Sequence, residues 1–475
     1  MNSGTSMKRR EFLSAAGSAL VLSTLAPRLA GGASKPSIQV LEARAAKAPL
    51  MNDAGPAAVW GYDGQVPGPI LRARQGETLH VRFENRLEQA STIHWHGIRI
   101  DNAMDGVAGL TQPAVPPGEG FDYVFTPPDA GTYWYHPHSR TWEQMARGLY
   151  GLLIVEEAEP PAVDRDVALV FDDWRLTDDG QIDEASLGSM RDWSHAGRLG
   201  NWLTVNGVSQ PEVFLRRGER LRLRLANCSN ARVLSLRLDG HAAWLVALDG
   251  QPVAPYQPED GVITLAPAQR ADLIVDAILG PGARTAVLEV SGDHAVETAF
   301  LTYRPDAPAR ETALPPPQAL PANPLPKDLD LGTALRQDLL MEGGAMGRMA
   351  GARHKGRQMG LRELVDQGLA WAFNGTAGMT ETPLLSVERS RSVVLDMIND
   401  TAWPHAMHLH GHHFRVIERD GEPQAETPWR DTVLVERGER VALAFPAENP
   451  GKWMLHCHML EHQAAGMATW IEVLG

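Results

Sequence analysis

Residues 456–467 read HCHMLEHQAAGM and place three histidines, a cysteine and two methionines within twelve positions. The chain has only one other cysteine, Cys228. A thiolate, two imidazoles and a weak axial thioether form the ligand set of a blue-copper electron-transfer centre. Cys457, His462 and Met467 can supply three of these four ligands, so one imidazole has to come from another part of the chain.

Histidines are concentrated in four short segments, which hold twelve of the 17 in the chain. The segments are HWH (94–96), HPH (136–138), HAMHLHGHH (405–413) and HCHMLEH (456–462). In a β-strand, residues i and i+2 point to the same face. His456 and His458 therefore face one side and Cys457 the other, so that one strand offers two imidazoles to one site and a thiolate to a second site behind it.

His405 in the third segment can complete the ligand set around Cys457. Eight histidines then remain for the opposite face, and three copper ions could share them as two, three and three. These eight are His94, His96, His136, His138, His408, His410, His456 and His458. Ordinary core or surface histidines are the alternative interpretation, and four clusters with this spacing argue against it.

The elements that carry these segments are predicted to be strands. Residues 62–85, 205–227 and 373–399 share one pattern, in which a turn is followed by alternating apolar and polar residues up to an Asn. Period-two alternation indicates half-buried strands, and three copies at wide spacing indicate three homologous β-domains. The sequence thus predicts an all-β fold of three β-sandwich domains.

The domain boundaries follow from the repeat and from a proline-rich stretch. Residues 304–327 contain eight prolines, which favour an extended linker. We place the domains at about 37–158, 159–305 and 328–475, with a linker over 306–327.

The N-terminus is typical of an export signal. Residues 1–33 contain a basic cluster with Arg9 and Arg10, a short apolar run and small residues near position 33. The paired arginines resemble a twin-arginine signal, which predicts the twin-arginine export machinery as a partner and a periplasmic or otherwise exported protein. A disordered basic tail is the alternative, but it does not explain the apolar run.

Charge and composition restrict the other partners. The formal charge of −14 and the absence of a basic stripe argue against nucleic acid, and no later segment is apolar and long enough for stable membrane insertion. Cys228 is predicted to be a small buried apolar residue rather than half of a disulfide.

The four histidine segments, in this order in a chain of three strand-rich domains, resemble those of the multicopper oxidases, both laccase-like enzymes and the bacterial copper efflux oxidase. The resemblance implies three cupredoxin-like domains and four copper ions. It also implies one-electron oxidation of a phenol, an aromatic amine or Cu(I), coupled to four-electron reduction of O2 to water, with a role in copper tolerance. The implied ligands are His405, Cys457, His462 and Met467 for type 1 copper, His94 and His408 for type 2, and His96, His136, His138, His410, His456 and His458 for the type 3 pair. His412 and His413 are left for supporting or surface positions.

Oxygen reduction consumes protons, so a carboxylate is expected near the histidine cluster. Asp105 matches the acidic position of the family, although an Asp–Gly turn is the alternative. Gln463 stands where many bacterial relatives carry an acidic residue, and its amide cannot relay a proton as a carboxylate can. Cys457 and its flanking histidines are the shortest covalent route for electrons between the two sites.

A methionine-containing segment bears on the identity of the reducing substrate. Residues 341–360 contain Met341, Met346, Met349 and Met359, whose thioethers could dock Cu(I). A Gly-rich loop with incidental methionines, or a helix with a methionine face, are the alternatives. Two other functions are compatible with a chain of this type: a periplasmic copper-sequestering protein without turnover, and a structural relative that has lost copper. The complete ligand set argues against the second.

Overall fold

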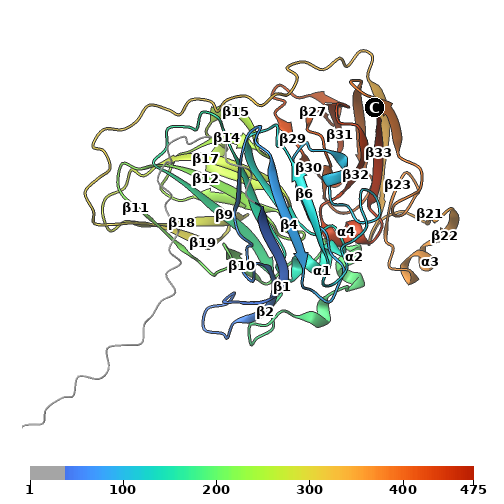
Figure 1. Ribbon diagram of the computed structural model, residues 1–475, viewed down its shortest axis with the longest axis horizontal. Helices are drawn as coiled ribbons and strands as arrows, with labels where there is room; N and C mark the ends of the chain where they lie inside the picture. The colour runs from blue at the N-terminus through green and yellow to red at the C-terminus, as the bar shows by residue number, and fades with distance from the viewer. Residues whose placement is uncertain (1–37) are drawn as a thin grey trace, which may run out of the picture. The chain divides into compact units, whose positions relative to one another are not determined.

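The computed structural model describes residues 38–475, and the predicted export signal at 1–33 lies outside the described residues. Strands dominate the described chain and are coloured from blue to red along it in Figure 1. The fold is all-β and consists of three cupredoxin-like sandwiches, as the sequence predicted. None of the helices in the described part has the length and apolar character needed to cross a membrane.

The first sandwich pairs a sheet of order β2–β1–β4–β6 with one of order β3–β8–β7–β5. Its strands are β1 (Gln39–Ala48), β2 (Ala57–Tyr62), β3 (Leu71–Arg74), β4 (Leu79–Asn85), β5 (His94–His96), β6 (Gly120–Phe125), β7 (Gly131–His136) and β8 (Gly151–Glu156). Its short helices are η1 (Asn102–Met104) and α1 (Thr141–Ala146). Alternate residues of β4, such as Val81 and Phe83, are buried in the core between the two sheets.

The middle sandwich pairs β10–β9–β12–β17–β14–β15 with β11–β19–β18–β13–β16. Its strands are β9 (Arg165–Trp174), β10 (Trp202–Val205), β11 (Glu212–Leu215), β12 (Arg220–Asn227), β13 (Leu234–Leu238), β14 (Ala243–Leu248), β15 (Gln251–Tyr256), β16 (Val262–Leu265), β17 (Arg270–Asp276), β18 (Arg284–Ser291) and β19 (His294–Tyr303). Its helices are η2 (Glu184–Ser186), α2 (Met190–Ser194) and η3 (Glu259–Gly261). Leu223 of β12 and Leu236 of β13 belong to one core, because the two sheets pack face to face.

The third sandwich pairs β23–β20–β25–β31–β27–β28, with β29 beside β27, against β24–β33–β32–β26–β30. Its strands are β20 (Leu335–Gly343), β23 (Trp371–Phe373), β24 (Leu385–Glu388), β25 (Ser392–Asn399), β26 (His405–Leu409), β27 (Phe414–Arg419), β28 (Glu422–Pro423), β29 (Trp429–Arg430), β30 (Thr432–Val435), β31 (Arg440–Pro446), β32 (Gly451–Cys457) and β33 (Ala468–Leu474). A separate hairpin joins β21 (Gly351–His354) to β22 (Arg357–Gly360), and the helices are α3 (Leu361–Asp366) and α4 (Leu460–Ala464).

The internal repeat predicted from the sequence is present in the structure. Asn85, Asn227 and Asn399 end equivalent strands, and each side-chain amide nitrogen donates to at least two backbone carbonyls. Each side-chain oxygen accepts from the backbone N–H two residues later, at Leu87, Ser229 and Thr401. A buried amide with all these bonds made fixes the loop after each strand in the same way.

The linker region contains no strand within the described residues between Tyr303 and Leu335. It is nevertheless tied to the first two sandwiches, because Asn323 donates to Ala130 O at 2.8 Å and to Gln251 Oε1 at 2.9 Å. The boundaries at 37–158, 159–305 and 328–475 stay predictions.

The methionine segment 341–360 contains no helix: it runs from the end of β20 through a loop at 344–350 into the β21–β22 hairpin. Met341, Met349 and Met359 are buried in hydrophobic cores, and only Met346, at 75% exposure, is open to solvent. Three of the four methionine side chains are therefore packed in hydrophobic cores, and the segment does not form an exposed cluster of thioethers.

This difference in burial predicts that replacing Met341 and replacing Met346 change the stability of the protein by different amounts. Met341→Ala should lower the free energy of unfolding by about 2–5 kcal/mol, because it leaves a cavity in the third core. Met346→Ala is the matched control and should change it by less than about 0.5 kcal/mol. Denaturant unfolding of both variants measures the difference, and equal values would contradict the packing described here.

Candidate metal centres

Strand pairing brings the four histidine segments together. β5 pairs with β7 so that His94 lies opposite His136, and β26 pairs with β32 so that His408 lies opposite His456. Trp95, between the two histidines of β5, points into the first core. Cys457 likewise points into the third core, away from its two neighbours. The alternation of strand side chains thus separates two sites.

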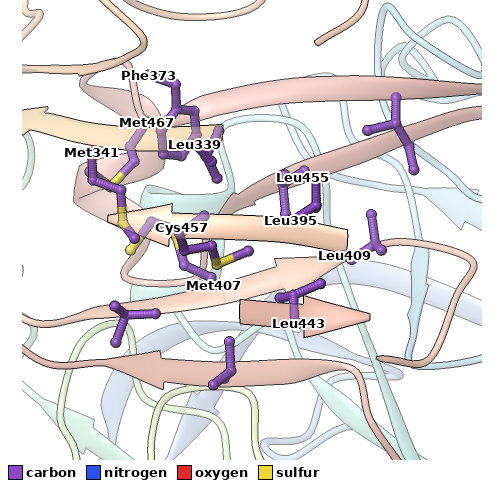
Figure 2. Packing of buried hydrophobic residues seen from close by; sticks show 14 of the residues in the cluster. Leu339, Met341, Phe373, Leu395, Met407, Leu409, Leu443, Leu455, Cys457 and Met467 are labelled. Atoms are coloured by element: carbon purple, nitrogen blue, oxygen red, sulfur yellow. The ribbon is translucent and has the colours of Figure 1, made fainter. Parts of the chain in front are cut away.

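The first site surrounds Cys457. Its Sγ lies 3.6 Å from His405 Nδ1 and 3.7 Å from His462 Nδ1, and these two nitrogens are 3.1 Å apart. Met467 is buried in the same core, where Figure 2 shows it together with Cys457. The loop is closed by the backbone N–H of Cys457, which donates to Met467 O at 3.1 Å.

Burial controls protonation at this site. It raises the pKa of the Cys457 thiol to about 12 and lowers the pKa of His462 to about 4. The imidazole is therefore neutral near pH 7, with a nitrogen lone pair available, and the thiolate requires a nearby cation. A soft metal ion provides one, so the donor set fits copper.

A segment of the middle sandwich covers this site. The Nε2–H of His462 donates to His195 O at 2.7 Å, and the indole N–H of Trp371 donates to Trp193 O at 2.5 Å. The N–H of Ala345 donates to the intervening carbonyl, Ser194 O, at 2.6 Å. The backbone carbonyls of three consecutive residues at the end of α2 thus accept hydrogen bonds from the third sandwich, and this segment covers the outer edge of the His462 ring.

The second site is a cluster of eight buried histidines. Two pairs of rings are stacked, His94 on His410 at 3.8 Å and His96 on His408 at 3.7 Å between ring centroids. Two further approaches join the strands: His410 Nε2 lies 3.1 Å from His456 Nε2, and His136 Nε2 lies 3.4 Å from His458 Nε2. Histidines from both ends of the sequence therefore form one continuous cluster.

The cluster contains ring nitrogens that lack hydrogen-bond partners within the described residues. These atoms are His94 Nε2, His96 Nδ1, His138 Nε2, His408 Nε2 and His458 Nδ1. An unpaired buried nitrogen costs about 1–3 kcal/mol, so a cluster of them calls for another partner. Burial also lowers the pKa values of His96, His138 and His408 well below the usual value, which keeps these rings neutral. Neutral, unpaired imidazoles fit a site for several metal ions.

Asp105 lies against this cluster. Both carboxylate oxygens are 3.1 Å from His410 Nδ1, and Oδ1 is 3.2 Å from His94 Nδ1. The side chain is buried directly after η1. Asp105 is therefore more than a turn residue, because its carboxylate contacts one histidine from each end of the chain.

A second carboxylate, Asp431, occupies the corresponding place beside the other stacked pair and was missed by the sequence reasoning. Its Oδ1 lies 3.2 Å from His96 Nε2 and 3.7 Å from His408 Nδ1. Asp431 lies in the sequence RDT between the short strands β29 and β30, a stretch with no recognisable motif. Only the folded structure shows that it lies beside the histidines.

Other candidate residues have different surroundings. Glu461 is buried and accepts hydrogen bonds from Asn230 Nδ2 at 2.8 Å and Arg198 N at 3.1 Å, so its carboxylate is directed to the middle sandwich. Gln463 is half-buried in α4. His412 and His413 are buried, which excludes the surface position and leaves the supporting one of the two positions expected for them. Burial also lowers the pKa of each to about 4. Cys228 is buried and unpaired in a core, as predicted.

Comparison with known proteins agrees with this arrangement. Family models described as multicopper oxidase match residues 45–160, 165–304 and 356–474. Multicopper oxidase MmcO of Mycobacterium tuberculosis is 31% identical over 87% of this chain and 82% of its own length. A copper resistance protein A homologue of Pseudomonas syringae pv. tomato is 25% identical over 86% and 88% of the two chains.

Solved structures give the same result. The multi-copper oxidase from Pseudomonas thermotolerans superposes with a TM-score of 0.79 at 32% identity, covering 93% of this chain and all of that one. Lac15 from a marine microbial metagenome gives a TM-score of 0.72 at 38% identity, covering 92% of this chain and all of that one. The two histidine-lined sites, the three sandwiches and these similarities over the whole described chain lead to one conclusion: the protein belongs to the multicopper oxidase family and is a copper-dependent oxidoreductase that uses O2.

Proposed function

We propose that the chain binds four copper ions and uses them to pass single electrons from a small reductant to O2. The type 1 ion is assigned to His405, Cys457, His462 and Met467, and the type 2 ion to His94 and His408. The type 3 pair is assigned to His96, His136, His138, His410, His456 and His458. Bound copper would supply one-electron acceptance at the cysteine site and reduction of O2 to water at the histidine cluster.

One observation supports this assignment above the others, namely the position of Cys457 in β32. Its sulfur contacts His405 and His462, while the adjacent His456 contributes to the other site, 3.1 Å from His410. The peptide bonds of one strand therefore connect the electron-accepting and oxygen-reducing sites, and the protein excludes bulk water from both by burial.

For the reductant we propose a phenol or an aromatic amine, with Cu(I) as the alternative. Burial of Met341, Met349 and Met359 leaves no exposed thioether cluster among the described residues, which weakens the case for a methionine-lined Cu(I) dock. Several relatives are named laccases. The relative named copper resistance protein A homologue keeps Cu(I) and a role in copper tolerance as the second candidate.

Copper loading followed by turnover tests this function. The purified metal-free protein is titrated with copper under reducing conditions and then oxidised, and the bound copper, the visible absorption and O2 consumption are measured. About four ions per chain, an intense blue band and O2 uptake with a phenol are expected. Copper binding without O2 uptake from either a phenol or Cu(I) would instead support sequestration without turnover.

We also propose that residues 1–33 direct export through the twin-arginine pathway, on the basis of Arg9, Arg10 and the apolar run after them. Changing both arginines to Lys should leave full-length precursor in the cytoplasm. Fractionation followed by mass determination measures this, and normal delivery of a shortened protein to the periplasm would rule out this route.

A further inference from the structure

We propose that Arg270, in the middle sandwich, is a positioning residue for the histidine cluster because it holds the Asp431 carboxylate against His96 and His408. The inference rests on the proposed copper function, and it gives the middle sandwich, which supplies none of the assigned ligands, a part in building the site.

The Asp431 side chain is completely buried and has several contacts that fix it. Its Oδ1 accepts from the hydroxyl of Thr432 at 2.8 Å and lies 3.2 Å from His96 Nε2. The backbone carbonyl of Asp431 accepts from His408 Nδ1–H at 2.8 Å. The residue therefore contacts both rings of one stacked pair, so its position determines how those rings are oriented.

Arg270 binds this carboxylate with both terminal nitrogens. Nη1 donates to Asp431 Oδ1 at 3.0 Å and Nη2 donates to Oδ2 at 2.7 Å. Its Nε donates to Thr132 O of the first sandwich at 3.1 Å. One guanidinium at the start of β17 therefore joins all three sandwiches beside the metal site.

The chemistry of this pair explains why it would affect the ligands. A buried carboxylate without a counter-charge becomes protonated or turns away, whereas the planar fork of an arginine fixes both oxygens in one plane. A carboxylate held on the non-ligating nitrogen of a histidine sets the ring orientation and increases its basicity, and losing such a contact typically weakens metal binding 10–100-fold.

Space around the pair is restricted as well. Gly97 follows His96 directly, with a φ of +85°, and a Cβ added there would overlap the Asp431 carboxylate and Arg270 Nη2. The backbone after the histidine thus packs directly on the ion pair, so a displaced pair would also move His96.

A neighbouring arginine provides the matched control. Arg224 of β12 is as deeply buried, is bidentate to Asp166 at 2.7 Å for both bonds, and donates to the Thr132 hydroxyl at 2.7 Å. Arg224 therefore forms a bidentate ion pair and a contact with the first sandwich as Arg270 does, although the Asp166 side chain is 29% exposed. Unlike Asp431, Asp166 has no hydrogen bond or ion pair with a histidine among the described residues.

The test compares copper binding by Arg270→Met, Arg270→Lys and Arg224→Met. We expect Arg270→Met to keep the blue absorption of the Cys457 site but to bind copper at the histidine cluster 10–100-fold more weakly, with altered hyperfine splitting of the non-blue Cu(II) signal in electron paramagnetic resonance. Arg270→Lys should recover part of the affinity because it restores the charge without the fork. Arg224→Met should bind copper as the wild type does, even if its unfolding temperature falls.

Three results would overturn the inference. The first is an unchanged copper affinity in Arg270→Met, and the second is an equal loss of copper affinity in Arg224→Met. The third is wild-type copper affinity in the neutral variant Arg270→Gln. If Arg270→Met does not fold, the near-isosteric Asp431→Asn carries the same expectation of weaker copper binding and an altered signal. Wild-type protein is loaded in parallel. Failure of the wild type to bind copper at the cluster would refute the proposed function, whereas normal wild-type loading with no effect in the variants would refute only the role of Arg270.

Discussion

Cys457→Ser should abolish the blue absorption band and reductant-driven O2 consumption while the protein stays folded. The serine oxygen does not replace a soft thiolate in a site with His405 and His462, and the intense colour of such a centre comes from the sulfur. Without the thiolate ligand, electrons would have no bonded route from copper at this site into β32 and on to His456 and His458. O2 consumption should fall to the background of the metal-free protein, as measured with an oxygen electrode and a phenol.

The other buried cysteine supplies the control for this prediction. Cys228 is 1% exposed and lies in a core that contains none of the assigned ligands. Cys228→Ser places the same hydroxyl in a comparable apolar setting, so it should reduce stability yet keep the blue band and turnover. If Cys457→Ser remains blue, or if both variants lose activity equally, the assignment of Cys457 is wrong.

Asp105→Asn should slow the reaction of the reduced protein with O2 about 100-fold, the lower end of what proton transfer from a positioned group contributes. Asparagine keeps the shape and one oxygen beside His94 and His410, but its amide cannot take up and release a proton as a carboxylate can. Reduction of the Cys457 site by a phenol should be unaffected, because that site lies on the other face of β32. Stopped-flow spectroscopy separates the two steps, with reduction followed at the blue band and reoxidation measured after mixing with O2.

Asp101→Asn is the appropriate comparison, since Asp101 precedes the same short helix η1 and is exposed. It should leave both steps unchanged. An O2 reaction of normal rate in Asp105→Asn would show that the carboxylate only orients the two histidines and that protons arrive by another route.

The local pattern of the sequence determined a large part of this molecule. Alternation along a strand is a property of the backbone, so HCH was enough to predict that Cys457 faces away from His456 and His458. The repeated turn, strand and terminal Asn were likewise sufficient to predict three related sandwiches. Each Asn makes the same local hydrogen bond, to the backbone N–H two residues later, so the pattern is visible in the sequence of each domain. These features depend on residues close together in the chain.

Tertiary structure decided what depends on residues far apart. The methionines at 341, 349 and 359 resemble a thioether cluster in the sequence, but the packing of the third sandwich buries them. Asp431 and Arg270 are 161 residues apart and have no distinguishing motif, yet they form a buried ion pair beside His96. The ligands are recognisable because metal binding demands particular residue types at fixed strand spacing. The groups that hold those ligands need only a charge at the right point in space. Many sequence positions could supply such a charge, and only the folded chain shows which of them does.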